Sequence, residues 1–205
     1  MLRLIPNILT LGRLVLTVVF LVMILYSPYA AHASILLDIA FVLFVVAGLT
    51  DIIDGIVARG LNVVSKFGRM VDPLVDKVLV CGTFVCFAVV GEPKLFDLGP
   101  VALGVIQWPV AGVLIVREAY VTVLRHVSEA RGISFAATAS GKVKMLTQSF
   151  AIGTVIIKMG HVQTATWGYW FTAVTYAVML AATVVSGLMA TRRLAGKNST
   201  EGRGT

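Results

Sequence analysis

The stretch DIIDGIVARGLNVVSKFGRMVDPLVDK, residues 51–77, gathers carboxylates in a chain that has few of them. The whole 205-residue chain has ten acidic residues, and four of them, Asp51, Asp54, Asp72 and Asp76, fall inside this stretch. Long apolar segments lie on both sides of it. Because an unpaired charge is costly to bury, four carboxylates placed beside apolar segments require a compensating partner.

The composition places these carboxylates in a membrane protein. Hydrophobic residues make up 58% of the chain and charged residues 13%, with a mean hydropathy of +0.94. Soluble domains contain about 25% charged residues. Apolar runs of about 20 residues, which cross a hydrocarbon core of ~30 Å as helices, recur along the chain. Alternating strand patterns are absent, so the sequence predicts an all-α integral membrane protein. The cores of six transmembrane helices are expected at residues 14–26, 34–50, 78–90, 101–116, 146–157 and 167–190. A short N-terminal helix that carries Asn7, Thr10 and Arg13 is expected to lie along the membrane interface before the first span.

The basic residues predict the orientation of these six spans. Of 17 lysines and arginines, only Lys94 and Lys158 approach one side of the layout. By the positive-inside rule, both termini and the loops after the second and fourth spans are expected to be cytoplasmic. Topology alone would explain this asymmetry, and attraction to anionic lipids or phosphate ligands would add a function to it. We expect one membrane domain over residues 1–193, followed by a polar and disordered tail over residues 194–205.

The spacing of the four carboxylates indicates that they converge. Asp51 and Asp54 are three residues apart and Asp72 and Asp76 four apart, so each pair shares one helix face. A short loop joins the second and third spans, which makes them antiparallel neighbours whose carboxylate faces can meet. Basic residues such as Arg59 could neutralise part of this charge. Divalent cations would do so more economically, and hard oxygen ligands favour magnesium, manganese or calcium.

The complete pattern reads D-x-x-D-G-x-x-A-R, eight residues, then G-x-x-x-D-x-x-x-D, and it resembles the signature of the CDP-alcohol phosphotransferase family. The resemblance extends to IPNILTLGR at 5–13, REAYVTVLR at 117–125 and AATASGKVKMLTQ at 136–148. These segments are similar to those of the bacterial members that make phosphatidylglycerol phosphate. One departure is Met145, where a threonine would be expected.

The resemblance implies a reaction and its site residues. Members of this family transfer the phosphatidyl group of CDP-diacylglycerol to an alcohol and release CMP. Asp51, Asp54 and Asp72 would be metal ligands, and Asp76 would be both a ligand and the general base for the acceptor hydroxyl. Two Mg²⁺ or Mn²⁺ ions and a homodimer are expected. The CDP-lipid would be held by Asn7, Thr10, Arg13, Gly55, Ala58, Arg59 and Gly68.

The acceptor is predicted from basic residues near the cytoplasmic ends of the fourth and fifth spans. The expected acceptor-binding residues are Arg117, Glu118, Arg125, Lys142 and Lys144. A basic pocket suits a phosphorylated acceptor such as glycerol 3-phosphate, which would give phosphatidylglycerol phosphate. Arg117 is the first choice, because it follows an unbroken apolar run, and Glu118 could orient it or contact acceptor hydroxyls. The alternative is that the basic residues only satisfy the positive-inside bias.

Other functions share parts of this pattern. A cardiolipin synthase of the family would use phosphatidylglycerol as acceptor, and a phosphatidylinositol-phosphate synthase would use a phosphorylated inositol. A divalent-cation transporter would place its carboxylates near the bilayer midplane, whereas these lie at the cytoplasmic ends of spans. We therefore expect a multi-pass enzyme of the bacterial inner membrane, with a cytoplasmic active site, membrane lipids around it and no nucleic-acid partner.

Overall fold

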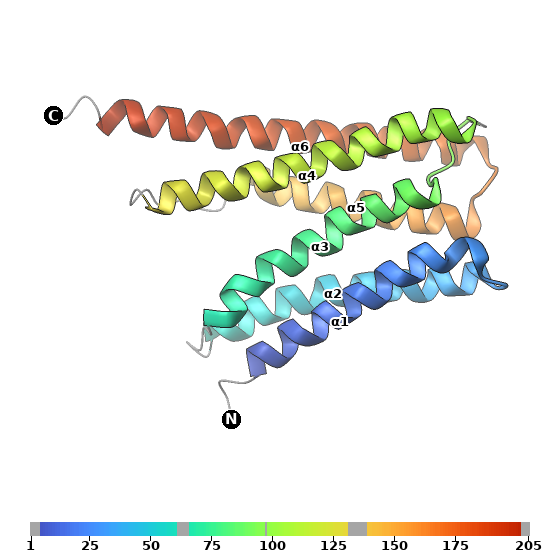
Figure 1. The fold of residues 1–205 in the computed structure, drawn as a ribbon, viewed down its shortest axis with the longest axis horizontal. Coiled ribbons are helices and arrows are strands. Elements are labelled where there is room, and N and C mark those ends of the chain that lie inside the picture. The colour runs from blue at the N-terminus through green and yellow to red at the C-terminus, as the bar shows by residue number, and fades with distance from the viewer. Residues whose placement is uncertain (1–4, 61–65, 97, 131–138, 202–205) are drawn as a thin grey trace.

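The computed structural model describes residues 5–60, 66–96, 98–130 and 139–201, without the side chains of 5–9, 51–60, 66–70, 72, 129, 130, 139 and 193–201. The described residues are almost entirely helical (Figure 1). The helices are α1 (Ile5–Tyr26), the 3₁₀ turn η2 (Ser27–Tyr29), α2 (Ala33–Gly60), α3 (Lys66–Val90), α4 (Pro100–Ala130), α5 (Ala139–His161) and α6 (Thr166–Glu201).

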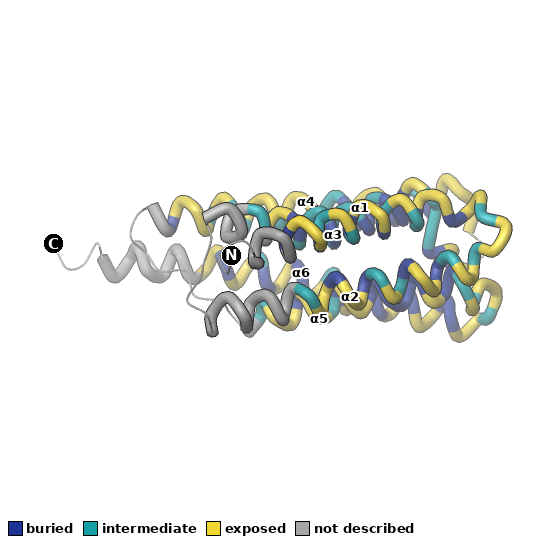
Figure 2. Tube along the Cα trace, turned by 90° about the horizontal axis from the view of Figure 1, so that it is seen from below, coloured by how far each residue is buried: buried dark blue, intermediate teal, exposed yellow. Residues whose placement is uncertain are grey.

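The helices form two layers. In Figure 2, α1, α3 and α4 lie in one row, and α2, α5 and α6 lie in the other. Within the rows, α3 packs against α1 and α4, and α5 packs against α2 and α6. The two middle helices, α3 and α5, also contact each other across the layers. Any polar side chain that α3 and α5 turn toward each other therefore lies inside the bundle.

The buried faces follow the helical period. On α1, Thr10, Arg13, Thr17, Phe20 and Ile24 are all buried and recur every three or four residues. This stripe is polar toward the N-terminal end of the helix and apolar toward its other end. Between these positions the surface is apolar as well, which suits lipid, where packing rather than water exclusion holds helices together. The stripe thus changes from a polar site at one end of the bundle to a core at the other.

In the described part of the chain, five helices are long and apolar enough to cross a membrane: the windows are Thr10–Tyr29, Ala33–Thr50, Pro73–Val90, Pro100–Ser128 and Thr166–Arg192. The expected span at 146–157 lies on α5, which does not meet this criterion within the described residues. The physical reason is that α5 carries buried polar side chains, including Lys144, Gln148 and Lys158. Residues 151–156 are all buried, so α5 is a helix of the bundle interior whose surface faces protein more than lipid.

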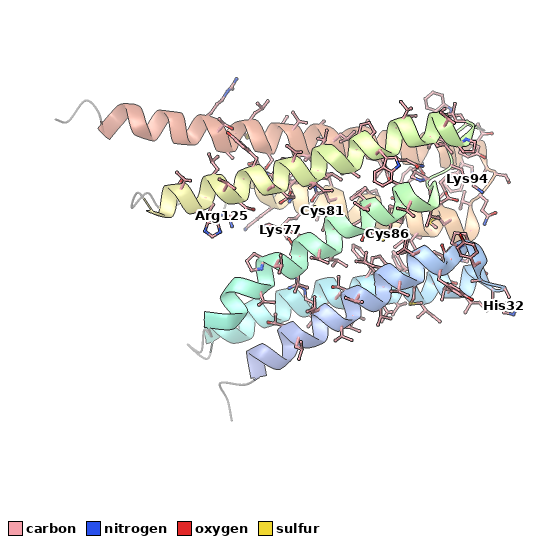
Figure 3. The ribbon with its side chains drawn as sticks, viewed as in Figure 1. His32, Lys77, Cys81, Cys86, Lys94 and Arg125 are labelled. Carbon is pink, nitrogen blue, oxygen red and sulfur yellow. The ribbon has the colours of Figure 1, made fainter. Side chains whose placement is uncertain are left out.

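The beginning of α1 and the end of α6 lie at the same end of the bundle (Figure 1). The turns that contain His32 and Lys94 lie at the opposite end (Figure 3). Lys77 and Arg125 lie nearer the end that holds the termini (Figure 3). This arrangement agrees with an even number of crossings.

Two expected boundaries differ from the structure. The N-terminal segment, which we expected as a separate interfacial helix, is the beginning of the continuous helix α1. Its one proline, Pro6, lies in the first turn, where proline does not interrupt a helix. The tail expected to be disordered from residue 194 is helical as far as Glu201. A helix already formed through residue 193 extends at little cost, since each further residue adds a hydrogen bond.

Candidate active site

The carboxylate signature lies where α2 ends and α3 begins. Asp51 and Asp54 are in the last three turns of α2, which ends at Gly60, and Asp72 and Asp76 are in the first three turns of α3, which begins at Lys66. Both pairs are therefore close to the connection 61–65. Of the four aspartates, only Asp76 belongs to the described side chains. The side chains of Asn7, Gly55, Ala58, Arg59 and Gly68 also lie outside the description.

Asp76 faces a buried arginine from α1. Arg13 is 2% exposed, and its Nη2 lies 4.0 Å from Asp76 Oδ1. The backbone carbonyl of Arg13 accepts a hydrogen bond from Thr17 Oγ1 at 2.8 Å, and Thr10 is buried one turn earlier. The N-terminal segment and the carboxylate signature, which are far apart in the sequence, thus meet at one site.

Glu118 of α4 joins two basic residues. Its Oε1 accepts a hydrogen bond from Lys144 Nζ of α5 at 2.5 Å and another from Arg117 Nη1 at 2.9 Å. Arg117 Nη2 donates to Ser186 Oγ of α6 at 2.6 Å. These four residues connect α4, α5 and α6. Charge-assisted hydrogen bonds of this kind are stronger than neutral ones, so they fix the position of the Lys144 ammonium.

A pocket lies between α3, α4 and α5 and brings Asp76 together with Glu118 and Lys144. Its remaining lining residues are Lys77, Val80, Met145, Gln148 and Ser149. The expected base and one expected acceptor-binding cation therefore line the same space.

The other basic candidates lie elsewhere. Arg117, our first choice, does not line the pocket and is turned toward Glu118 and Ser186. Arg125 and Lys142 are exposed. Within the described residues, Lys144 is the acceptor candidate that the bundle buries beside Asp76.

Two polar residues of this region were not among our candidates. Ser186 is buried on α6 and holds Arg117 from a position 69 residues away. Gln148 lines the pocket and is 1% exposed. The spacing of Lys144 and Gln148, four residues apart on one helix, was the signal in the sequence that could have found Gln148.

Glu118→Gln is expected to lower the free energy of unfolding by about 3 kcal/mol, because it leaves two largely buried cations without their shared counter-charge. Thermal unfolding in detergent, without substrates, measures this change. Asp38→Asn is the matched control, since Asp38 is exposed and pairs only with His161 Nε2, at 2.7 Å, among its described neighbours. Equal melting temperatures for Glu118→Gln and the control would contradict the structural role of the Glu118 pairs.

The fold and the pocket define a multi-pass all-α membrane protein with a polar site near one end of its bundle. The chain belongs to the CDP-alcohol phosphatidyltransferase family, whose sequence model matches residues 3–188.

Several curated bacterial proteins are similar to it. A probable phosphatidylglycerophosphate synthase of Mycobacterium tuberculosis is 33% identical over 153 residues, which cover 75% of this chain and 66% of that protein. The CDP-diacylglycerol–glycerol-3-phosphate 3-phosphatidyltransferase of Bacillus subtilis is 33% identical over 165 residues, which cover 74% of this chain and 76% of that protein. A protein of the same name from Rickettsia bellii is 30% identical over 153 residues, 74% of each chain.

Proposed function

We propose that this protein transfers the phosphatidyl group of CDP-diacylglycerol to glycerol 3-phosphate, giving phosphatidylglycerol phosphate and CMP. The observation that carries the proposal is the pocket in which Asp76, the last carboxylate of the complete family signature, lies beside the buried cation Lys144. The names of the relatives from B. subtilis and R. bellii give the same donor and acceptor for those proteins, and the name of the M. tuberculosis relative gives the same product.

Asp76 serves as the base in this reaction. The acceptor hydroxyl oxygen attacks the β-phosphorus of the CDP-lipid, its proton passes to an Asp76 oxygen, and the bond from that phosphorus to the CMP oxygen breaks. Asp76 is 34% exposed on its side chain, so a substrate hydroxyl can reach it. Arg13 Nη2, 4.0 Å from Asp76 Oδ1, places a positive charge near this carboxylate.

The aspartates also fit a divalent-cation site. Asp51, Asp54, Asp72 and Asp76 lie on two helix ends joined by residues 61–65, and carboxylate oxygens are the ligands that Mg²⁺ and Mn²⁺ prefer. Bound there, two such ions would stabilise the charge of the diphosphate. The cytidine and diphosphate are assigned to the same two helix ends. The residues that would bind them there are Gly55, Ala58, Arg59 and Gly68.

The acceptor phosphate is bound by Lys144, and Arg125 and Lys142 are further, exposed cations on α4 and α5. Lys144 is held by Glu118, and Arg117 with Ser186 holds Glu118 in turn. Asn7, Thr10 and Arg13 are placed on the lipid-substrate side. The active site and both termini are cytoplasmic, and the enzyme acts as a homodimer in the bacterial inner membrane.

The test is an acceptor competition with purified protein in detergent. CDP-diacylglycerol and Mg²⁺ are supplied with one acceptor at a time, and CMP release is measured for glycerol 3-phosphate, phosphatidylglycerol, inositol 1-phosphate and serine. We expect release with glycerol 3-phosphate alone, and loss of that release on addition of EDTA. Release only with phosphatidylglycerol or inositol 1-phosphate would support the proposed phosphatidyl transfer but show that the acceptor is not glycerol 3-phosphate. No release with any of them would contradict the proposed reaction.

A further inference from the structure

Gln148 has a buried oxygen that the protein leaves without a hydrogen-bond donor. The residue is 1% exposed on α5. Its Nε2 donates to Thr183 Oγ1 of α6 at 3.4 Å, and that hydroxyl in turn points to Met179 Sδ at 3.9 Å. Thr183 thus accepts the hydrogen bond from the amide nitrogen of Gln148. The amide oxygen, Oε1, accepts no hydrogen bond within the part of the chain that the structure describes.

A buried carbonyl oxygen without a donor costs free energy, so proteins rarely keep one. Gln148 lines the same pocket as Asp76, Glu118 and Lys144. The described charged groups of this pocket divide into two cations and two carboxylates, and Glu118 already accepts hydrogen bonds from Lys144 and Arg117. Two of the described lining residues, Gln148 and Ser149, offer neutral acceptor oxygens. Of these two oxygens, Gln148 Oε1 is the one that is buried without a described donor.

We propose that Gln148 Oε1 accepts a hydrogen bond from the non-reacting hydroxyl of the acceptor, and that this contact selects a polyol phosphate over a simple hydroxyalkyl phosphate. The inference rests on the proposed function, because it assigns the residue to the acceptor of that reaction. Lys144 binds the phosphate, Asp76 takes the proton of the reacting hydroxyl, and Gln148 recognises the second hydroxyl. A neutral acceptor suits this task, since a hydroxyl that is not to be deprotonated requires no charged partner.

The test compares glycerol 3-phosphate with 3-hydroxypropyl phosphate, which lacks only the 2-hydroxyl. We expect wild-type protein to prefer glycerol 3-phosphate in kcat/KM for CMP release. Gln148→Met, which keeps the length of the side chain and removes its polar atoms, should lower kcat/KM for glycerol 3-phosphate about fivefold, the effect of one neutral hydrogen bond. The same variant should leave kcat/KM for 3-hydroxypropyl phosphate near the wild-type value.

Two control variants separate recognition from packing. Gln107→Met removes a buried glutamine whose Oε1 is likewise without a described donor, but Gln107 bonds the Pro93 carbonyl at 3.2 Å and does not line the pocket. Thr183→Val removes the partner of Gln148 Nε2 and leaves Oε1 in place. Both should keep the wild-type preference. If Gln148→Met does not purify as a folded protein, Gln148→Asn, which withdraws the amide by one methylene, gives the same comparison.

The possible results are distinct. Equal losses for both acceptors in Gln148→Met, or a wild-type protein that does not distinguish them, would overturn the role of Gln148 and leave the proposed function standing. A change of preference in Thr183→Val equal to that in Gln148→Met would also overturn it, since packing would then be the cause. Absence of CMP release from wild-type protein with glycerol 3-phosphate would overturn the proposed function, and this inference with it.

Discussion

Asp76→Asn is expected to reduce CMP release about 1,000-fold, while binding of CDP-diacylglycerol is largely retained. General-base catalysis contributes roughly 100- to 10,000-fold, and an amide cannot accept the proton of the acceptor hydroxyl. The substitution keeps the size of the side chain, and the 4.0 Å between Arg13 Nη2 and Asp76 Oδ1 is longer than a hydrogen bond. The measurements are CMP release with saturating glycerol 3-phosphate and equilibrium binding of CDP-diacylglycerol in the presence of Mg²⁺.

Asp38→Asn makes the same chemical change on α2 near the opposite end of the bundle, where Asp38 is exposed and contacts His161. It should retain wild-type turnover. A turnover of Asp76→Asn within about tenfold of wild type would assign the base to another residue. Loss of CDP-lipid binding together with turnover would instead make Asp76 mainly a ligand-holding residue.

Asp72→Asn, a change in the same set of four aspartates, is expected to weaken both the binding of CDP-diacylglycerol and turnover, because Asp72 is proposed as a metal ligand only. A comparison of Asp72→Asn with Asp76→Asn therefore separates the two roles within one helix. If both variants lost CDP-lipid binding to the same extent, the distinction between ligand and base on α3 would be wrong.

Five of the six helices could be predicted from mainly apolar runs. The sixth run, at 146–157, contains Gln148 and lies on α5, which does not meet the criterion for a membrane span within the described residues. The run at 34–50 corresponds to the window Ala33–Thr50, and the run at 78–90 lies within Pro73–Val90. The run at 101–116 lies at the start of a longer helix, α4, which continues to Ala130. Hydropathy marks where lipid contact is needed, whereas polar residues after residue 116 can remain helical when they face another helix or water. This is why predicted cores were shorter than the helices.

The choice among basic residues could not be predicted, because it depends on which helix faces meet. Lys142 and Lys144 are two residues apart, and on a helix such positions point to different sides. Lys142 is exposed, whereas Lys144 is 6% exposed and lies beside Glu118. The Arg117–Ser186 contact joins positions 69 residues apart, and no local pattern in α4 or α6 specifies that pairing. The sequence thus predicts a set of basic candidates on α4 and α5, and tertiary packing places Lys144 in the pocket and turns Arg117 toward Glu118 and Ser186.

Lys144→Met is expected to raise the KM for glycerol 3-phosphate about 100-fold and to leave the KM for CDP-diacylglycerol nearly unchanged. A hydrogen bond between a buried cation and a phosphate contributes about 1.5–3 kcal/mol, and about 2.7 kcal/mol corresponds to 100-fold. The ammonium lies 2.5 Å from Glu118 Oε1 and in the same pocket as Asp76, so it can hold a phosphate within reach of the base. Steady-state kinetics with each substrate varied in turn measures both constants.

The charge itself, rather than the packing of the side chain, should be the cause. Lys144→Arg keeps the charge and should recover part of the affinity, although the guanidinium does not reproduce the position of an ammonium. Lys94→Met is the matched control, since Lys94 is exposed at the opposite end of the bundle beside Glu92 and should show wild-type constants (Figure 3). Equal increases in both KM values for Lys144→Met would mean that the variant disturbs the whole site. A KM for glycerol 3-phosphate that stays at the wild-type value would remove Lys144 from the acceptor pocket. The exposed residues Arg125 and Lys142 would then be the remaining basic candidates.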